Sequence, residues 1–249
     1  MDARIQEFFT DHYESNWYLA SRAEVLAAVI NPVCRTTSGC RVVDVGAGTG
    51  SILARVKGGG PAFGIEGEWA LARAGQANQT ATFVVANLGH GIPLSNQSAD
   101  VVLALDVLEH LDDDRTVMDE VFRILRPSGH FIISVPAFQG LWSRHDELHH
   151  HKRRYSKQRL FDIIASAGFR CTRMTYFNCL LLPLVYASRK LESFTRPSAS
   201  DYEKAPPRLA RALGAIFRFE SRIVPRWNLP IGVSLLAVAT RPDGRSGKA

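Results

Sequence analysis

The sequence predicts an α/β fold in which helices cover both faces of a parallel sheet. Short, almost wholly apolar runs recur along the chain, as expected for strands that are buried on both faces. Segments with apolar residues at helical spacing follow several of these runs, which is the alternation of β–α–β units. A glycine-rich turn, Gly46 to Gly50, follows the first run, where the backbone can bend tightly and approach a ligand.

Length and composition fit one such domain with an insertion, since 249 residues, 46% of them hydrophobic, can bury a proper core. The four cysteines include no C-x-x-C pair, which argues against a disulfide scaffold or a cysteine zinc site and favours a reducing cytoplasm. Charged residues before the first apolar run argue against a signal peptide. The longest apolar run, Cys179 to Ala187, is too short to span a bilayer.

The N-terminal residues 2–30 predict a helix in two pieces, broken near His12 to Asn16. Apolar side chains at helical spacing support the second piece, Ala20 to Ile30, and Ser21 is its candidate N-cap. The first strand is predicted at Arg41 to Val45, before the glycine turn. Apolar positions from Ser51 to Val56 then predict a helix after that turn.

The later elements are predicted in the same way. Gly58 to Pro61 indicates a break in the chain, and Arg126 to Gly129 indicates a turn. Ser156 caps a helix that a glycine stop ends at Gly168. The predicted strands are Ala62 to Glu66, Thr82 to Ala86, Ala99 to Asp106, His130 to Val135, Arg170 to Phe177 and Val233 to Thr240, and the predicted helices among them are Asp114 to Leu125 and Ser156 to Ala167.

The spacing of the glycines narrows the choice of ligand. A dinucleotide site has G-x-G-x-x-G, whereas this turn has G-x-G-x-G, with the acidic Asp44 inside the preceding strand. No Lys-Ser or Lys-Thr pair follows, as it would in a phosphate-binding P-loop. The turn therefore disfavours both a nicotinamide dehydrogenase and a P-loop enzyme.

The D-x-G-x-G-x-G string resembles the first motif of class I S-adenosylmethionine-dependent methyltransferases. The strings LALDVLEHL and LRPSGHFIISVP are also typical of this family, and the resemblance covers residues 36–177 and 229–240. It implies a three-layer, Rossmann-like, doubly wound sheet of seven strands with the seventh antiparallel, and a helical insertion between strands six and seven. The expected divisions are an N-terminal helical cap over 1–35, the methyltransferase domain over 36–177 and 229–241, a helical lid over 178–228 and a flexible tail over 242–249.

The resemblance implies S-adenosylmethionine as cofactor, held by the glycine turn. Glu66 would accept hydrogen bonds from the ribose hydroxyls, although it also suits the N-terminus of a helix. Asn87 stands where the family commonly has an aspartate that binds the adenine amino group. Arg22 would pair with the methionyl carboxylate, or lie at the surface. The full predicted set is Trp17, Arg22, Asp44, Gly46, Ala47, Gly48, Gly50, Glu66, Gly67, Asn87, Leu88 and Asp106.

The acceptor site is predicted in the loop after the fifth strand, which holds four of the eight histidines. Its H-D-x(4)-H-x-R-R-Y string resembles a subgroup of bacterial methyltransferases. His145 with Asp146, or His151, is the candidate general base. The alternative is that Arg154 to Ser156 merely seats the next helix and that His149 to His151 is solvated. Consecutive histidines cannot converge on one ion in regular structure.

A metal site is a further alternative at Asp106, Glu109 and His110, which would share one face of a helical turn. The same string occurs in ubiquinone-type O-methyltransferases that use a divalent metal, and in many relatives that use none. We therefore expect no metal and predict no metal ligand.

The insertion carries most of the net charge of +6, because residues 178–230 hold nine Lys or Arg and four Asp or Glu. This asymmetry indicates an anionic partner or surface, or simply a solvated helix face. Two amphipathic helices, Leu180 to Leu191 and Leu209 to Ile223, are joined by a link with three prolines, Pro197, Pro206 and Pro207. They suit a lid over an acceptor that is apolar with an anionic part. A peripheral membrane anchor, a homodimer face and packing against the chain's own domain are alternatives.

The sequence thus predicts an S-adenosylmethionine-dependent methyltransferase that acts on a small, lipophilic or anionic acceptor, at oxygen. An RNA or protein methyltransferase is one alternative, but no [DN]-P-P-[FY] element follows the fourth strand, and we expect no nucleic acid partner. A non-catalytic cofactor-binding module is the other.

Overall fold

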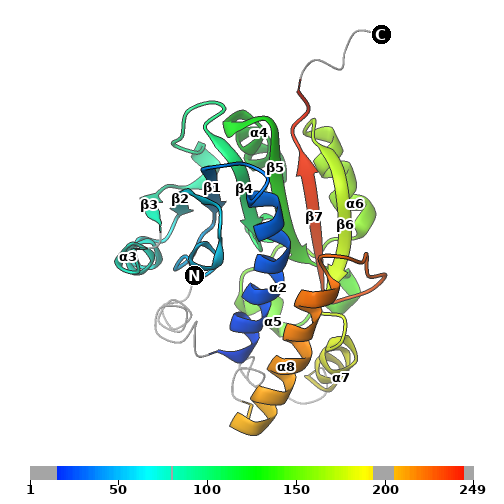
Figure 1. Ribbon diagram of the computed structural model, residues 1–249. Coiled ribbons are helices and arrows are strands. Elements are labelled where there is room, and N and C mark those ends of the chain that lie inside the picture. The colour runs from blue at the N-terminus through cyan, green and yellow to red at the C-terminus, as the bar shows by residue number, and fades with distance from the viewer. Residues whose placement is uncertain (1–15, 80, 193–204, 244–249) are drawn as a thin grey trace.

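The computed structural model describes residues 16–79, 81–192 and 205–243. The first piece of the predicted N-terminal helix, the link around Pro197 and the end of the predicted tail lie outside these residues. Figure 1 shows a twisted sheet with helices in front of it and behind it. No helix among the described residues is long and apolar enough to cross a membrane.

The sheet has seven strands in the order β3-β2-β1-β4-β5-β7-β6, and β7 is antiparallel to both of its neighbours. This confirms the predicted three-layer α/β fold, with β1 and β4 at the point where the order of the strands reverses. The strands are β1 (Cys40–Val45), β2 (Gly59–Glu66), β3 (Thr82–Val85), β4 (Ala99–Leu105), β5 (Leu125–Pro136), β6 (Arg170–Phe177) and β7 (Ser234–Thr240). The α-helices are α2 (Trp17–Cys34), α3 (Trp69–Ala77), α4 (Asp114–Ile124), α5 (Arg144–Leu148), α6 (Lys157–Ser166), α7 (Leu182–Glu192) and α8 (Pro207–Ile223).

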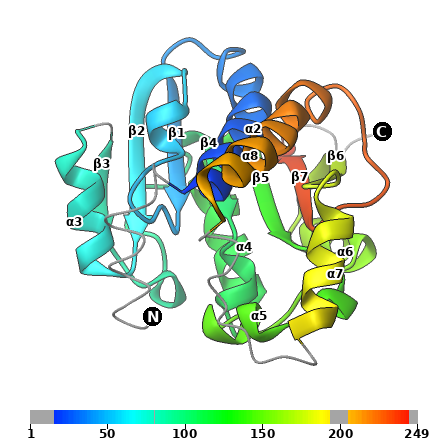
Figure 2. The same cartoon turned by 90° about the horizontal axis from the view of Figure 1, so that it is seen from below.

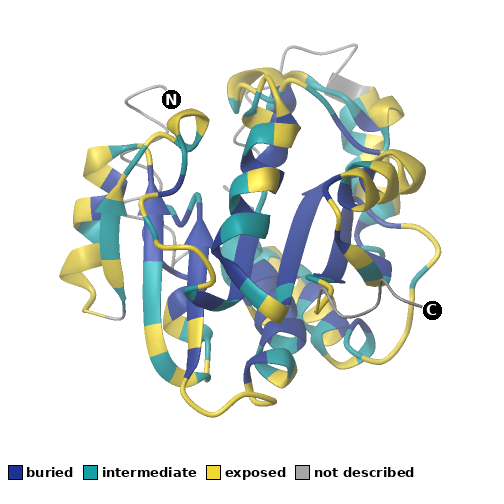
Figure 3. Cartoon of the chain, turned by 90° about the horizontal axis from the view of Figure 1, so that it is seen from above, coloured by how far each residue is buried: buried dark blue, intermediate teal, exposed yellow. Residues whose placement is uncertain are grey.

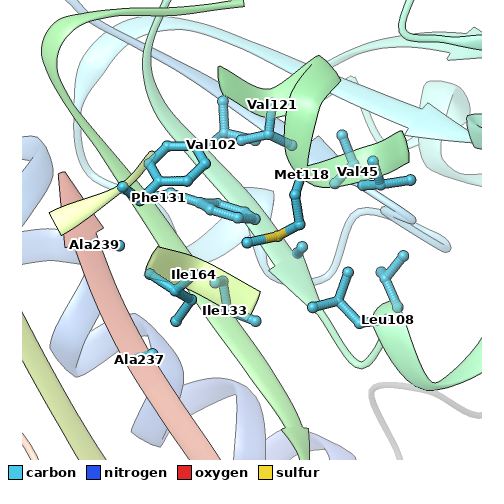
Figure 4. Packing of buried hydrophobic residues seen from close by; sticks show 14 of the residues in the cluster. Val45, Val102, Leu108, Met118, Val121, Phe131, Ile133, Ile164, Ala237 and Ala239 are labelled. Atoms are coloured by element: carbon cyan, nitrogen blue, oxygen red, sulfur yellow. The ribbon is translucent and has the colours of Figure 1, made fainter. Parts of the chain in front are cut away.

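Alternate residues of the central strands enter two separate apolar cores, one on each face of the sheet. In β4, Val102 and Ala104 join the core with α4 and α6, whereas Val101 and Leu103 join the core with α2 and α8. Figure 4 shows the first core close up, and Figure 3 shows that the central strands are buried while the outer faces of the helices are exposed. Burial on both faces explains why these strands are apolar at nearly every position.

Helices α2 and α8 lie side by side on one face, as Figures 1 and 2 both show. The first described residue, Asn16, caps α2, because its side-chain oxygen accepts hydrogen bonds from the N–H groups of Tyr18 and Leu19. The prediction of Ser21 as the cap is therefore wrong. Ser21 is buried inside the helix, where its hydroxyl donates to Trp17 and to the carbonyl of Gly214 in α8.

Three local predictions differ from the structure. Only a short 3-10 helix, η1 (Leu53–Arg55), follows the glycine turn, because the chain enters β2 four residues later. The glycines predicted as a break instead begin β2 at Gly59. The predicted turn at Arg126 to Gly129 lies within β5, where the register with β4 shifts and Ser128 has a positive φ of 62°.

The insertion between β6 and β7 is anchored by one buried carboxylate. Glu220 of α8 is fully buried, and it accepts hydrogen bonds from the backbone N–H groups of Asn178, Cys179 and Leu180 at 2.6–2.8 Å. These are the first three residues after β6. The carboxylate therefore fixes α8 to the end of the sheet.

We expect Glu220→Ala to lower the free energy of unfolding by about 3 kcal/mol or more, because three buried N–H groups lose their acceptor. Glu220→Gln should cost less, since its amide oxygen still accepts. Denaturant unfolding measures both changes, and Arg222→Ala, an exposed change on the same helix, is the matched control. An effect of Glu220→Ala no larger than that of the control would contradict the anchoring role.

Candidate active site

The polar residues predicted to bind a cofactor gather at one edge of the sheet. Asp44, Glu66 and Asp106 lie at or just after the carboxyl ends of β1, β2 and β4, and Asn87 follows β3. These four strands are parallel, so their carboxyl ends share an edge. The order of the strands reverses between β1 and β4, which is where open α/β sheets bind ligands.

The glycine turn adopts a conformation that only glycine takes without strain. Gly46, Gly48 and Gly50 all have positive φ, between 55° and 76°. A Cβ on Gly46 would approach Val107 to 2.5 Å, and one on Gly50 would approach Phe83 to 2.7 Å. Packing therefore requires glycine at both positions. By contrast, a Cβ on Gly48 would meet nothing within 4 Å. The turn therefore exposes open space at Gly48.

Glu66 joins the turn to the next strand. One of its carboxylate oxygens accepts the N–H of Gly48 at 2.8 Å, and the other accepts the N–H of Glu68 at 2.9 Å. Each carboxylate oxygen has a second lone pair, so Glu66 retains acceptor capacity for ligand hydroxyls. Gly67, also predicted at the cofactor, follows it directly and is exposed.

Asp44 lies beneath this loop and is almost fully buried. Its Oδ1 has no hydrogen-bond partner among the described residues. Burial and the nearby Glu66 carboxylate raise the pKa of Asp44 to about 8, although Arg22 opposes the shift. Burial of the Asp44 carboxyl, with one oxygen unpaired, therefore destabilises the folded protein.

Arg22 has a partner within the chain. Its guanidinium lies 2.5 Å from Asp106 Oδ2 and donates to the Ser134 hydroxyl, which lies 3.1 Å from Asp106 Oδ1. Arg22 is buried, so any ligand carboxylate would share it with Asp106. Trp17 lies at the start of the same helix, edge-on to Tyr18. Ser134 was not predicted from the sequence, because a serine inside an apolar strand carries no specific signal.

Asn87 and Leu88 lie after β3 at the same edge. Asn87 is exposed, and its side-chain oxygen already accepts the N–H of Gly89 at 2.9 Å. A cavity of about 460 Å³ lies beside it, lined by Ala86, Asn87, His90, Gly91, Ile92, Pro93, Glu120 and Arg123. Asn87 therefore offers a ligand its amide N–H groups and the second lone pair of its oxygen.

In the loop after β5, Asp146 is fully buried and forms the centre of a charged network. Its carboxylate accepts two hydrogen bonds from the Arg154 guanidinium at 2.8 and 3.0 Å and one from the Ser143 N–H at 2.9 Å. Although burial opposes it, the hydrogen bond with His151 and the Arg154 charge hold the pKa of Asp146 well below its usual range. Asp146 therefore stays ionised, and the Arg154 guanidinium compensates its negative charge. The alternative that Arg154 only positions the next helix does not account for this pair.

The candidate histidines have different surroundings. His151 Nδ1 lies 2.9 Å from Asp146 Oδ1, and its side chain is 10% exposed. His145 instead packs against His149, with ring centroids 4.3 Å apart. Burial and His149 lower the pKa of His145 well below its usual value, so it binds a proton weakly. The structure thus joins Asp146 to His151 and not to its neighbour His145.

Glu109 and His110 meet His151 at the same edge, in a cluster whose ligand atoms lie within 4.8 Å of one another. They belong to η3 (Leu108–His110), the 3-10 helix after β4. Burial and the nearby Asp106 raise the pKa of Glu109 well above its usual value. Asp106, the third member of the metal alternative, is paired with Arg22 instead.

Three residues within two positions of a strand end at this edge have positive φ although they are not glycine. They are Asp106, Phe138 and Asn178, with φ of 56–58°, and they follow β4, β5 and β6. Such strain persists only where the surrounding structure fixes it, and it is frequent at functional sites. Its occurrence after β4, β5 and β6 supports a functional role for this edge of the sheet.

Comparisons with known proteins bear on this edge. Residues 43–133 match the family described as a methyltransferase domain. An uncharacterized methyltransferase of Mycobacterium sp. (strain KMS) is 31% identical over 148 residues, 57% of this chain and 59% of that protein. The malonyl-[acyl-carrier protein] O-methyltransferase of Hahella chejuensis is 31% identical over 143 residues, 52% of this chain and 50% of that protein.

A solved structure of geranyl diphosphate methyltransferase in complex with S-adenosylmethionine resembles the fold with a TM-score of 0.62. It is 16% identical and the match covers 93% of this chain and 91% of that chain, so the likeness shows the fold alone. The chain spans between 50% and 59% of the length of the two curated relatives.

We expect Asp44→Asn to make the stability of the ligand-free protein less dependent on pH. Because folding raises the pKa of Asp44 from 3.8 to about 8, the folded protein binds a proton that the unfolded chain has released between these values. Stability from this group is full below pH 4 and falls as the pH rises toward 8, by up to about 1.4 kcal/mol per pH unit.

The variant lacks this loss, so its advantage over the wild type should widen from pH 5 to pH 8 in denaturant unfolding. Asp119→Asn, on the exposed face of α4, is the matched control. If the difference in the free energy of unfolding between Asp44→Asn and the wild type does not change with pH, the explanation is wrong.

Proposed function

We propose that this chain, which belongs to the class I S-adenosylmethionine-dependent methyltransferases as its sequence predicted, transfers a methyl group to the oxygen of a small acceptor. The observation that carries the proposal is the open space at Gly48, beside the Glu66 carboxylate and at the switch point of the sheet. A cofactor without phosphates suits this edge, because acidic residues line it.

Under this proposal the cofactor lies along the carboxyl ends of β1 to β4. Glu66 accepts the ribose hydroxyls, and Asn87 with Leu88 contacts the adenine. The pair of Arg22 and Asp106 faces the methionyl end, where a guanidinium suits the carboxylate and a carboxylate suits the amino group. Support for this orientation comes from the ion pair itself, which sets both charges 2.5 Å apart at the strand ends.

We place the acceptor under α7, as the predicted lid over residues 178–228 requires. Arg189 of α7 donates to the carbonyl of Leu141 and lies 3.8 Å from the buried Asp146, so the helix contacts the loop after β5. Leu184 and Tyr186 expose apolar surface beside the charge of Lys190. These features support an acceptor that is lipophilic with an anionic part.

The oxygen target has separate support from the Hahella chejuensis relative, whose name describes an O-methyltransferase. Methyl transfer to a hydroxyl oxygen requires that the acceptor lose its proton to a base, whereas a carboxylate oxygen has no proton to lose. A nearby imidazole serves as the base in the first case. Four free cysteines support a reducing compartment such as the cytoplasm.

Of the three predicted catalytic residues, His151 has the strongest support for this role. Asp146 holds its Nδ1, which leaves Nε2 as the ring nitrogen available to the acceptor. Asp146 then acts as a positioning residue, because Arg154 and Ser143 already occupy its carboxylate. His145 stays a weaker candidate because of its burial.

The proposal is tested by adding S-adenosylmethionine with a labelled methyl group to the purified protein and a cell extract. We expect label in the small-molecule or lipid fraction. The comparison variant is Gly48→Val, which should lose at least tenfold in cofactor affinity, since its side chain fills the open space. Because Gly48 has a positive φ of 55°, valine is also strained there, so circular dichroism first checks that the variant is folded. Label only in RNA or protein would favour the alternative acceptors, and no cofactor binding by the wild type would overturn the proposal.

We expect His151→Ala to lower turnover by about 10²- to 10⁴-fold, the usual contribution of a positioned proton-transfer group, while cofactor affinity changes less than about threefold. Steady-state kinetics and calorimetric binding separate the two effects. His145→Ala is the matched comparison and should have a smaller effect. Equal turnover of His151→Ala and wild type would remove His151 from the mechanism.

A further inference from the structure

Two loops bring three metal-ligating side chains together at the carboxyl edge of the sheet. Glu109 and His110 come from η3 after β4, and His151 comes from the loop after β5. One ligand atom from each lies within 4.8 Å of the others. A tetrahedral ion with bonds of 2.0–2.2 Å separates its ligands by about 3.5 Å, so each group needs to move by only about an ångström.

The Glu109 carboxyl gives independent support for a ligand at this cluster. Its side chain is fully buried, and neither of its carboxylate oxygens has a hydrogen-bond partner among the described residues. Burying a carboxyl group without a partner costs free energy, and buried carboxylates are normally paired or bound to a metal. Of the arginines near Glu109, Arg22 forms an ion pair with Asp106 and Arg154 forms one with Asp146.

His151 is prepared as a ligand by the group behind it. Asp146 accepts the hydrogen bond from Nδ1 and so fixes the ring, which leaves the Nε2 lone pair available. This carboxylate–histidine arrangement is what orients most metal-binding histidines. Asp146 is itself held by hydrogen bonds from Arg154 and Ser143, so the orientation of the His151 ring depends on these residues too.

The two loops are also fixed to each other. The N–H of Lys152, the residue after His151, donates to the Glu109 carbonyl at 2.7 Å. Arg153 donates to the carbonyls of Leu111 and Asp112 at 2.9 and 3.0 Å. These bonds hold His151 beside η3 without any ion. His110 is exposed, which leaves a path for a cation to enter.

We propose that Glu109, His110 and His151 bind one divalent cation of the zinc, cobalt or iron class. Two imidazoles and one carboxylate favour these cations over Mg²⁺ and Ca²⁺, which prefer oxygen ligands. Three protein ligands leave at least one coordination position open. This site differs from the Asp106, Glu109 and His110 set that the sequence suggested, because Asp106 pairs with Arg22.

The role of the cation deepens the proposed function and rests on it. The cluster lies at the same edge as the predicted acceptor, so an acceptor oxygen at the open position would bind next to the cofactor. There the cation would supply a Lewis acid that makes the oxygen easier to deprotonate. His151 would then hold the cation through its Nε2 lone pair in place of acting as the base, and the acceptor's proton would pass to water at the exposed side of the cluster.

The test is cation binding to the full chain, free of any histidine tag and stripped with chelator. Calorimetry with Zn²⁺, and visible absorption with Co²⁺ as a probe of coordination, should both give one equivalent per chain, while Mg²⁺ should not compete at equal concentration. Glu109→Gln and His110→Ala should each weaken Zn²⁺ binding at least tenfold. His149→Ala is the matched control, because its ring lies 6.0 Å from that of His151 but outside the triad, and it should bind normally.

The outcomes decide between the site and the function. Absence of stoichiometric binding, or equal weakening in His149→Ala and His110→Ala, would overturn the site. If Glu109→Gln fails to fold, the exposed His110 still provides the readout. Methyl transfer by a protein that binds no cation would remove the cation site and keep the proposed function. Cation binding without any methyl transfer would keep the cation site and remove the proposed function.

Discussion

The hydrogen bond from the Gly48 N–H to the Glu66 carboxylate is the contact on which the arrangement of this edge depends. It joins the turn after β1 to the end of β2 and so holds an irregular backbone open above the sheet. Val107 packs so closely against Gly46 that no side chain fits there, which closes the turn from the other side. Between these contacts, no atom lies within 4 Å of the position that a Cβ on Gly48 would occupy.

Charges at the same edge are arranged in two groups with different partners. Arg22 and Asp106 neutralise each other beside the glycine turn, and Arg154 neutralises Asp146 under the loop after β5. Glu109 lies near both arginines, and neither of its carboxylate oxygens has a hydrogen-bond partner among the described residues. One oxygen of Asp44 is also without a partner there, and buried carboxyl groups of this kind are costly unless they gain one.

The helical insertion contacts both the core beside α2 and the loop after β5. Glu220 fixes α8 to the end of β6, and Ser21 joins α8 to α2, so the insertion is packed into the same core as the N-terminal helix. Arg189 of α7 reaches the loop that carries His151. A segment that the sequence presents as separate from the domain is therefore in direct contact with the candidate acceptor site.

The sequence by itself determined the order of the strands along the chain and the place of the glycine turn. Burial on both faces makes the central strands apolar, and glycine takes a positive φ without strain. It also placed Asp44, Glu66 and Asp106 at strand ends. Only the tertiary structure decided which side chains pair, since Arg22 with Asp106, and Asp146 with His151 and Arg154, depend on how loops from different strands meet. Glu109 and His151 are 42 positions apart in the sequence, and only the parallel neighbours β4 and β5 bring them together.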